Sequence, residues 1–162
     1  MTSPYILVAD DDPSILYLVA DILRDEGYAV ELARNGREAL DVIARRDVPA
    51  LVVLDMRMPV VDGWEFASRL RAQQLNPPIL VMTAARNARE WAAEIEAVGY
   101  LAKPFDLDDF LREVNRLAPP PPDKAGSDGR SLFAVGLPAS LLTAAIRRAL
   151  AAGSASRTAR PA

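Results

Sequence analysis

The sequence predicts an α/β protein in which a doubly wound, five-stranded parallel sheet carries helices on both faces, followed by a linker and a short C-terminal helix. Three observations predict it. Short, continuous apolar runs alternate with helical segments, polar residues follow four of those runs directly, and a proline-rich stretch begins after residue 118. Strands that are apolar throughout are typical of parallel sheets, because helices bury both faces of such sheets.

Five short apolar segments are the predicted strands. Runs of this length and composition are typical of strands buried on both sides. Parallel neighbours need a crossover connection, and a helical segment separates each run from the next. The predicted strands are 5–9 (YILVA), 28–33, 51–54 (LVVL), 78–82 (PILVM) and 99–102.

The helices between the strands have an apolar face and recognisable ends. In the first, apolar residues recur from Ile15 to Leu23, Pro13 suits the first turn, and Gly27 ends the helix. Asp12 is an N-cap candidate. The remaining predicted helices are 36–45, 63–71, 88–97 and 106–117, the last beginning in an acidic cluster that suits a helix N-terminus.

The chain after residue 118 differs in composition from the part before it. Four consecutive prolines at 119–122 cannot continue a helix, so 119–138 is predicted to be a linker. Residues 139–152 place leucine, isoleucine and alanine on one helical face and predict an amphipathic helix, and 153–162 are predicted to be disordered. We therefore expect one folded domain, 1–118, with an appendage.

Composition excludes several classes of function. The chain has no cysteine and no histidine, which excludes disulfides, thiolate or imidazole zinc sites and histidine-assisted nucleophiles. Any phosphohistidine that reacts with this chain must belong to another molecule. No apolar run approaches the roughly 18 residues of a membrane span, and the N-terminus lacks the basic region of a signal peptide. We expect no membrane association and a cytoplasmic location.

Charge is distributed unevenly along the chain. The segment up to Pro122 has 20 acidic and 13 basic residues, a net charge of −7, whereas the remaining 40 residues have 2 acidic and 6 basic, a net charge of +4. A basic tail on an acidic body suggests a separate task or a tail that folds back. The four arginines at 147, 148, 157 and 160 favour a solvated surface, so we do not expect nucleic-acid binding.

Polar side chains follow four of the five predicted strands. Open parallel sheets place their active groups in the crevice at the carboxyl ends of the strands. Carboxylates are the hard oxygen ligands that Mg²⁺ prefers, an ammonium supplies a point charge, and a hydroxyl donates a hydrogen bond. Each residue alone has a plainer interpretation as a cap or turn residue, but together they predict one anion- and metal-binding site. They are Asp10 and Asp11, Asp55, Thr83 and Lys103.

Four segments in this order resemble the signature segments of response-regulator receiver domains: ILVADDDPSI, LVVLDMRMPVVDGWEF, ILVMTA and GYLAKPFD. The resemblance covers about 118 residues of the chain. It implies a flavodoxin-like sheet of order 2-1-3-4-5. It also implies a phosphorylation-dependent switch of a two-component or phosphorelay system, which catalyses only its own Mg²⁺-dependent aspartyl phosphorylation and dephosphorylation.

The family's residue roles can be carried over to matching positions. Asp55 would accept the phosphoryl group. The resemblance assigns metal binding to Asp10, Asp11, Asp55 and the backbone carbonyl of Arg57, with Asp10 acting largely through water. It assigns phosphoryl binding to Thr83, the backbone N–H of Ala84 and Lys103, switching to Thr83 and Tyr100, and a cis peptide bond to Pro104.

The resemblance also implies partners. The phosphoryl donor would be a histidine kinase or a His-phosphotransfer protein, and an unidentified protein would receive the signal. A homodimer could form through the face made by 88–97, 99–102 and 106–117. The sequence departs from the family there: only 19 residues separate Thr83 from Lys103, and Ile95-Glu96-Ala97 replaces the usual Ala-Gly-Ala. We expect a short or shifted helix in 88–97, with Trp91 partly exposed.

Three alternatives stay open. The chain could be a pseudo-receiver that binds a partner without phosphorylation, although the complete set of site residues argues against this. It could be a haloacid-dehalogenase-like phosphatase, but Arg57 stands where that Asp-x-Asp motif has its second acid. It could also be a transcription regulator that acts through its C-terminal tail.

Overall fold

The computed structural model describes residues 4–118 and residue 121. The predicted helix 139–152, the tail 153–162 and, apart from Pro121, the linker 119–138 lie outside the described residues. The elements are β1 (Tyr5–Ala9), α1 (Pro13–Asp25), β2 (Ala29–Ala33), α2 (Gly36–Arg45), β3 (Leu51–Leu54), α3 (Gly63–Ala72), β4 (Ile79–Thr83), α4 (Ala88–Glu94), β5 (Gly99–Ala102) and α5 (Leu107–Leu117).

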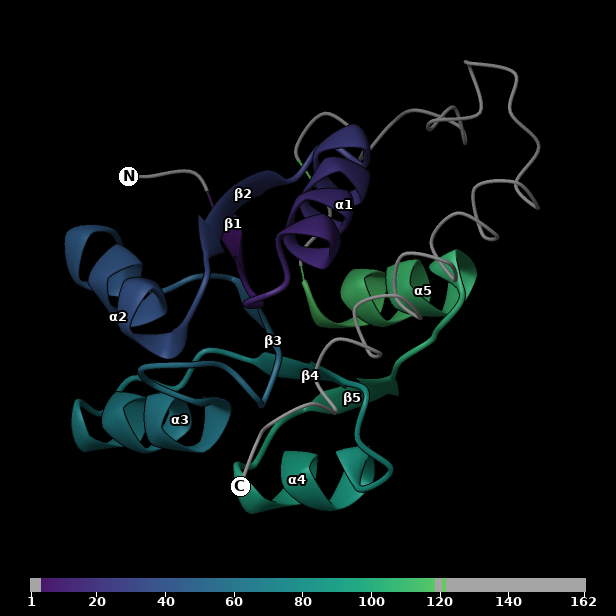
Figure 1. Ribbon diagram of the computed structural model, residues 1–162. Coiled ribbons are helices and arrows are strands. Elements are labelled where there is room, and N and C mark those ends of the chain that lie inside the picture. Colours follow the sequence, from purple (N-terminus) through teal and green to yellow (C-terminus); the bar gives the residue numbers. More distant parts are fainter. Residues whose placement is uncertain (1–3, 119–120, 122–162) are drawn as a thin grey trace.

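The five strands form one parallel sheet in the order β2-β1-β3-β4-β5 (Figure 1). In this order β1 and β3 are neighbours, with Ile6 opposite Leu51, and β3 and β4 are neighbours, with Val52 opposite Ile79. Helices α1 and α5 cover one face of the sheet, and α2, α3 and α4 cover the other. The predicted doubly wound architecture and strand order are confirmed.

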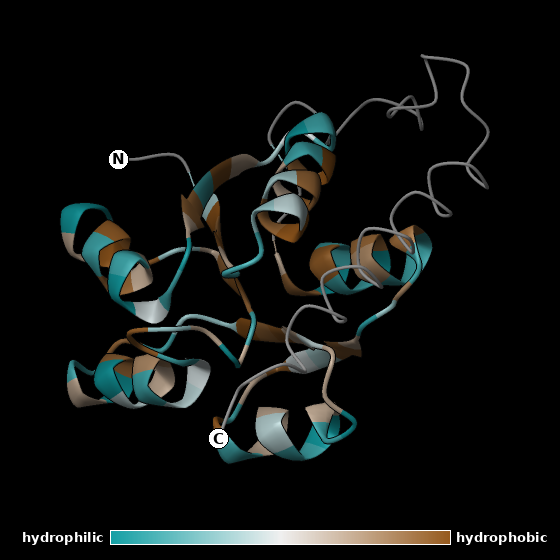
Figure 2. Cartoon of the chain, viewed as in Figure 1, coloured by the Kyte–Doolittle hydropathy of each residue, from teal (hydrophilic) through white to brown (hydrophobic). Residues whose placement is uncertain are grey.

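The sheet separates two hydrophobic cores. Because side chains of a strand alternate between its faces, Ile6 and Val8 of β1 join the core under α1 and α5, whereas Leu7 joins the core under α2, α3 and α4. Phe110 and Phe66 are fully buried, one in each core. Burial of each such side chain stabilises the fold by roughly 1.5–3 kcal/mol. Figure 2 shows the same pattern, with hydrophobic strands and hydrophilic outer helix faces.

Most predicted boundaries agree with the structure to within a residue. Helix α4 is the exception, since it ends at Glu94 and not at Ala97, which confirms the short helix expected in this region. Glu96 has a φ of 58°, and two backbone bonds close the helix end, from Glu96 N to Ala93 O at 3.1 Å and from Ala97 N to Ala92 O at 2.8 Å. This is a Schellman-type ending. Glycine is the usual residue at that left-handed position. Because Glu96 stands there, the sequence did not indicate that the helix ends at this point.

Smaller boundary differences affect four other elements. Strand β2 begins at Ala29, one residue later than predicted, and β4 runs from Ile79 to Thr83, so that Thr83 is the last strand residue. Helix α3 extends to Ala72, and α5 begins at Leu107. Among the described helices, none has the length and apolar character that crossing a membrane requires.

Candidate functional site

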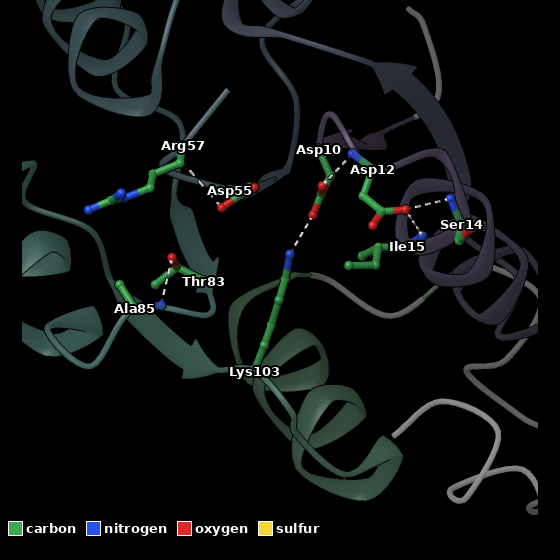
Figure 3. A network of polar contacts seen from close by, with 9 residues as sticks. All are labelled: Asp10, Asp12, Ser14, Ile15, Asp55, Arg57, Thr83, Ala85 and Lys103. Carbon is green, nitrogen blue, oxygen red and sulfur yellow. Dashed lines mark hydrogen bonds and ion pairs between the residues drawn. The ribbon is translucent and has the colours of Figure 1, made fainter. Parts of the chain in front are cut away.

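The predicted site residues converge at the carboxyl edge of the sheet. Asp10 directly follows β1, and Asp55 directly follows β3. Two backbone hydrogen bonds continue the sheet past the strand ends and fix the positions of Asp55 and Lys103. Asp55 N donates to Ala9 O at 2.9 Å, and Lys103 N donates to Thr83 O at 2.8 Å. The four strand ends therefore meet around one space, as the sequence predicts (Figure 3).

Three carboxylates form the centre of the site. One carboxylate oxygen from each of Asp10, Asp11 and Asp55 lies within 4.8 Å of the others. Asp10 and Asp55 are fully buried, and Asp11 is partly buried. A hydrogen bond from Asp12 N to Asp10 Oδ1, 2.9 Å long, orients the first carboxylate. Like charges this close repel one another, so the arrangement calls for cations.

Lys103 supplies one cation. Its Nζ lies 2.7 Å from Asp10 Oδ2, and both side chains are almost completely buried. Three ionised carboxylates and one ammonium leave a formal charge of −2, which a divalent cation would neutralise. The donors are hard oxygens, with neither imidazole nor thiolate among them, and this set fits Mg²⁺. Asp10, Asp11 and Asp55 are the side chains that could hold the ion.

The loop after β3 positions Asp55 further. Arg57 N donates to Asp55 Oδ1 at 3.4 Å, while the Arg57 side chain points away from the carboxylate (Figure 3). The loop is tight because Gly63 N donates to Met56 O at 2.9 Å. A Cβ at Gly63 would lie 2.8 Å from Met56 Cα, too close for any side chain. Asp62 acts as the N-cap of α3 and accepts from Glu65 N at 2.9 Å.

Thr83 and Tyr100 lie on adjacent strands. Thr83 is 2% exposed, and its Oγ1 accepts from Ala85 N at 3.3 Å. Ala84 is the exposed residue that directly follows β4. Tyr100 pairs with Val81 across β4 and β5, and it is 43% exposed. The Thr83 hydroxyl is thus inside the site, and the Tyr100 ring is outside it.

Two further predicted features are present. The peptide bond between Lys103 and Pro104 is cis, the isomer that the resemblance implies. Asp12 is the N-cap of α1, and its carboxylate accepts from Ser14 N at 2.9 Å and from Ile15 N at 3.4 Å. Asp12 is therefore engaged at the helix end and does not belong to the three-carboxylate cluster.

One group beside the site was not predicted from the sequence. The Arg57 guanidinium lies 5.1 Å from the centre of the Trp91 ring, and the Trp91 ring meets Trp64 edge-on with centroids 4.7 Å apart. Trp91 is partly buried, consistent with the partial exposure expected of it. The sequence contains two tryptophans, Trp64 and Trp91. Whether their rings meet depends on how α3 and α4 pack, which no pattern in the sequence indicates.

Comparison with known proteins identifies the family. The family model for the response regulator receiver domain matches residues 6–115. The chain is 42% identical over 132 residues to response regulator MprA of Mycolicibacterium vanbaalenii, which covers 79% of this chain and 57% of the relative. It is 38% identical over 129 residues to transcriptional regulatory protein TcrA of Mycobacterium tuberculosis, and this match covers 75% of this chain and 51% of the relative.

Solved structures agree. Response regulator TrrA of Thermotoga maritima, determined in complex with Mg²⁺ and BeF, has a TM-score of 0.64 and 34% sequence identity, and the match covers 71% of this chain and 99% of that one. The chain belongs to the response-regulator receiver family, a family of phosphorylation-dependent switches in two-component systems. Receiver domains are not enzymes in the usual sense. The chain spans about half the length of the curated relatives it matches.

Proposed function

We propose that this chain accepts a phosphoryl group on Asp55 from a phosphohistidine of another protein and signals by protein contact. The observation that carries the proposal is the meeting of three carboxylates within 4.8 Å, with the Lys103 ammonium 2.7 Å from one of them. Such a group of charges serves a reaction that moves a phosphoryl dianion, because it offers a nucleophile, metal ligands and a fixed cation at one point.

The chemistry assigned to the side chains is a direct displacement. An ionised Asp55 oxygen attacks phosphorus, the new O–P bond forms as the N–P bond of the donor breaks, and the electron pair leaves with the donor imidazole. Asp10, Asp11, Asp55 and the Arg57 carbonyl would hold Mg²⁺, which neutralises charge on the phosphoryl oxygens when bound. Lys103 would move from Asp10 to the phosphoryl group, and the Ala84 N–H would donate to it. The chain would also catalyse the loss of its own phosphoryl group.

The proposed switch uses Thr83 and Tyr100. The Thr83 hydroxyl would turn toward the phosphoryl oxygens, and the exposed Tyr100 ring would move into the space that it leaves. Two hydrogen bonds to a charged group contribute about 3–6 kcal/mol together. Shifting a two-state equilibrium from 1:99 to 99:1 takes about 5.5 kcal/mol. The upper part of this range reaches the required value, so two such bonds are adequate for an almost complete switch with little to spare.

The partners follow from this chemistry. The chain contains no histidine, so the phosphohistidine must belong to a histidine kinase or a His-phosphotransfer protein. The face formed by α4, β5 and α5 carries the exposed Tyr100 and is our candidate for binding the downstream protein or a second copy of the chain. A cytoplasmic location stays a prediction from the sequence.

Acetyl phosphate labelling tests the proposal. The full chain is incubated with Mg²⁺ and acetyl phosphate, and its intact mass is measured beside that of Asp55→Asn, which keeps the side-chain volume and removes the nucleophile. We expect a gain of one phosphoryl group in the wild type and none in the variant. A chain that gains no mass and shows no tryptophan fluorescence change with beryllofluoride would instead be a phosphorylation-independent scaffold.

Transcription regulation is the second candidate, and the similarity to TcrA favours it. Here the phosphorylated chain would act on DNA, either through its basic C-terminal segment or together with another protein. A salt-dependent mobility shift of DNA by the full chain would support this candidate, because phosphate contacts weaken as salt rises. Loss of the shift on removal of residues 139–162 would assign it to that segment.

A further inference from the structure

Helix α4 depends on its neighbours for its position. With seven residues, Ala88–Glu94, it is the shortest of the described helices, and the side chain of its N-cap residue Asn87 makes no capping hydrogen bond. Its buried residues, Ala88 and Ala92, are small. A helix this short is not stable by itself in water, so packing contacts must hold it in place.

Two tryptophans supply contacts of this kind. Trp91 on α4 meets Trp64 on α3 edge-on, with ring centroids 4.7 Å apart and an interplanar angle of 69°. Trp64 Nε1 also donates a hydrogen bond to Glu94 Oε2 at 2.7 Å. Both rings pack against the core that lies under α2, α3 and α4. Helix α4 is thereby attached to α3 at two points along its length.

The Trp91 ring also contacts the loop after β3, which holds the proposed phosphoacceptor Asp55. The Arg57 guanidinium lies 5.1 Å from the centre of the Trp91 ring, a cation–π distance. The backbone N–H of Arg57 donates to Asp55 Oδ1 at 3.4 Å. A continuous series of contacts therefore runs from the Asp55 carboxylate through Arg57 to Trp91 on α4. It shares no residue with the pair Thr83 and Tyr100.

We propose that Trp91 is a positioning residue that links Mg²⁺ occupancy of the carboxylate site to the position of α4 through Arg57. This inference rests on the proposed function, because the Arg57 carbonyl is one of the metal ligands proposed there. Holding the Arg57 side chain over the ring restricts the loop and keeps that carbonyl ready for the ion. Coupling of this kind is reciprocal, so freeing α4 weakens Mg²⁺ binding, and bound Mg²⁺ steadies α4.

The magnitude follows from the type of contact. A single cation–π contact at a partly exposed ring changes an equilibrium by about two- to fivefold. We expect Trp91→Leu and Arg57→Met each to weaken Mg²⁺ affinity by that factor. The double variant should bind no more weakly than either single variant, because both substitutions remove the same contact. The Arg57 carbonyl is present in every variant.

The experiment is an NMR titration of the full chain with Mg²⁺, paired with hydrogen exchange of the α4 amides with and without Mg²⁺. Arg46→Met is the matched control, since the Arg46 guanidinium lies 4.7 Å from the Tyr5 ring, at the start of β1 and thus at the opposite edge of the sheet. The wild type and this control should bind Mg²⁺ equally and protect α4 on binding. The Trp91 and Arg57 variants should bind more weakly and leave α4 unprotected.

The outcomes separate the two proposals. Variant affinities and α4 protection equal to those of the wild type would overturn the linkage while leaving the metal site intact. Additive losses in the double variant would also overturn it, because the two side chains would then act independently. Absence of Mg²⁺ binding by the wild type would instead overturn the proposed function and the linkage with it. If Trp91→Leu unfolds α4, the exposed Arg57 side chain still provides the test through Arg57→Met.

Discussion

The Lys103 ammonium and the Asp10 carboxylate form a buried ion pair, with Nζ 2.7 Å from Oδ2 and side chains 2% and 0% exposed. The two residues follow different strands, β5 and β1, which are separated by two other strands in the sheet. The pair therefore connects the β1 and β5 sides of the site. The Lys103 ammonium, which we propose binds the phosphoryl group, is bound to Asp10 in this pair. Phosphorylation would therefore replace the ion pair of Lys103 with Asp10 by an ion pair of Lys103 with the phosphoryl group.

Removal of Lys103 should destabilise the fold. Lys103→Met leaves the buried Asp10 charge without this partner, which typically costs about 3–5 kcal/mol of the free energy of unfolding. Adding Asp10→Asn should restore part of the loss, because the buried negative charge is then gone. Urea denaturation in EDTA measures all three variants. A loss in the double variant equal to the sum of the single losses would show that the pair does not interact.

Asp11→Asn should have the opposite effect on stability. The substitution relieves repulsion among three carboxylates within 4.8 Å and should raise the free energy of unfolding by roughly 1 kcal/mol without metal. Mg²⁺ at 100 times its Kd should stabilise the wild type by about 2.7 kcal/mol and the variant by much less. Thermal denaturation with Mg²⁺ or EDTA measures both effects.

Asp12→Asn is the control for that prediction. It removes a neighbouring negative charge from a residue that caps α1 and lies outside the cluster, and asparagine is an equally good N-cap. Its stability and its response to Mg²⁺ should match those of the wild type. Equal responses of Asp11→Asn and Asp12→Asn would remove Asp11 from the proposed metal site.

Thr83 should be required for movement of Tyr100 but not for phosphorylation. In Thr83→Ala we expect acetyl phosphate labelling to persist, because Asp55 and the proposed metal ligands are intact. Beryllofluoride should bury the Tyr100 ring, 43% exposed in this structure, in the wild type and in Thr83→Ser, which keeps the hydroxyl. NMR shifts of the ring report the movement. A Tyr100 response in Thr83→Ala equal to the wild type would contradict the proposed switch.

The fold and most of the site could be predicted from the sequence for one physical reason. Short apolar runs mark buried parallel strands, and residues directly after them, such as Asp10, Asp55 and Lys103, must share one edge of the sheet. The strand order did not follow from these patterns and came from the family resemblance. A short or shifted helix was expected at 88–97 and α4 is short, but its end at Glu94 was not predicted, because Glu96 adopts a left-handed conformation without a glycine.

The contact between Trp64 and Trp91 illustrates what remained beyond prediction. It depends on the distance between α3 and α4 and on side-chain orientation, neither of which periodicity encodes. The same holds for the Lys103–Asp10 pair: the sequence placed both residues at one edge, but only packing shows that the ammonium meets this carboxylate. Sequence patterns indicate which residues can meet, whereas the structure shows which do.

Gly63→Ala should distort the phosphoacceptor loop. The added Cβ would lie 2.7 Å from Met56 Sδ and 2.8 Å from Met56 Cα, and the backbone atom cannot move away without shifting the loop. We expect a loss of about 1–3 kcal/mol, as for overpacking in a core, and slower labelling of Asp55. Gly99→Ala is the control, because its Cβ would meet side-chain ends, Glu113 Oε2 and Arg116 Nη2 among them, that can shift.

Two buried tyrosines predict how stability depends on alkaline pH. Burial raises the pKa of Tyr5 and of Tyr28 above the ordinary 10.0, and nearby Glu26 adds to the rise for Tyr28. The folded chain then holds these phenol protons more tightly than the unfolded chain, so their contribution to stability is complete below about pH 10 and is lost as the pH rises through the folded pKa.

Tyr28→Phe removes one of the two groups along with its 3.1 Å hydrogen bond to Asn115 Oδ1. Its free energy of unfolding should start lower than that of the wild type near neutral pH and fall less steeply above about pH 10. Urea denaturation across that range measures the slopes, and identical slopes would contradict the assignment to Tyr28.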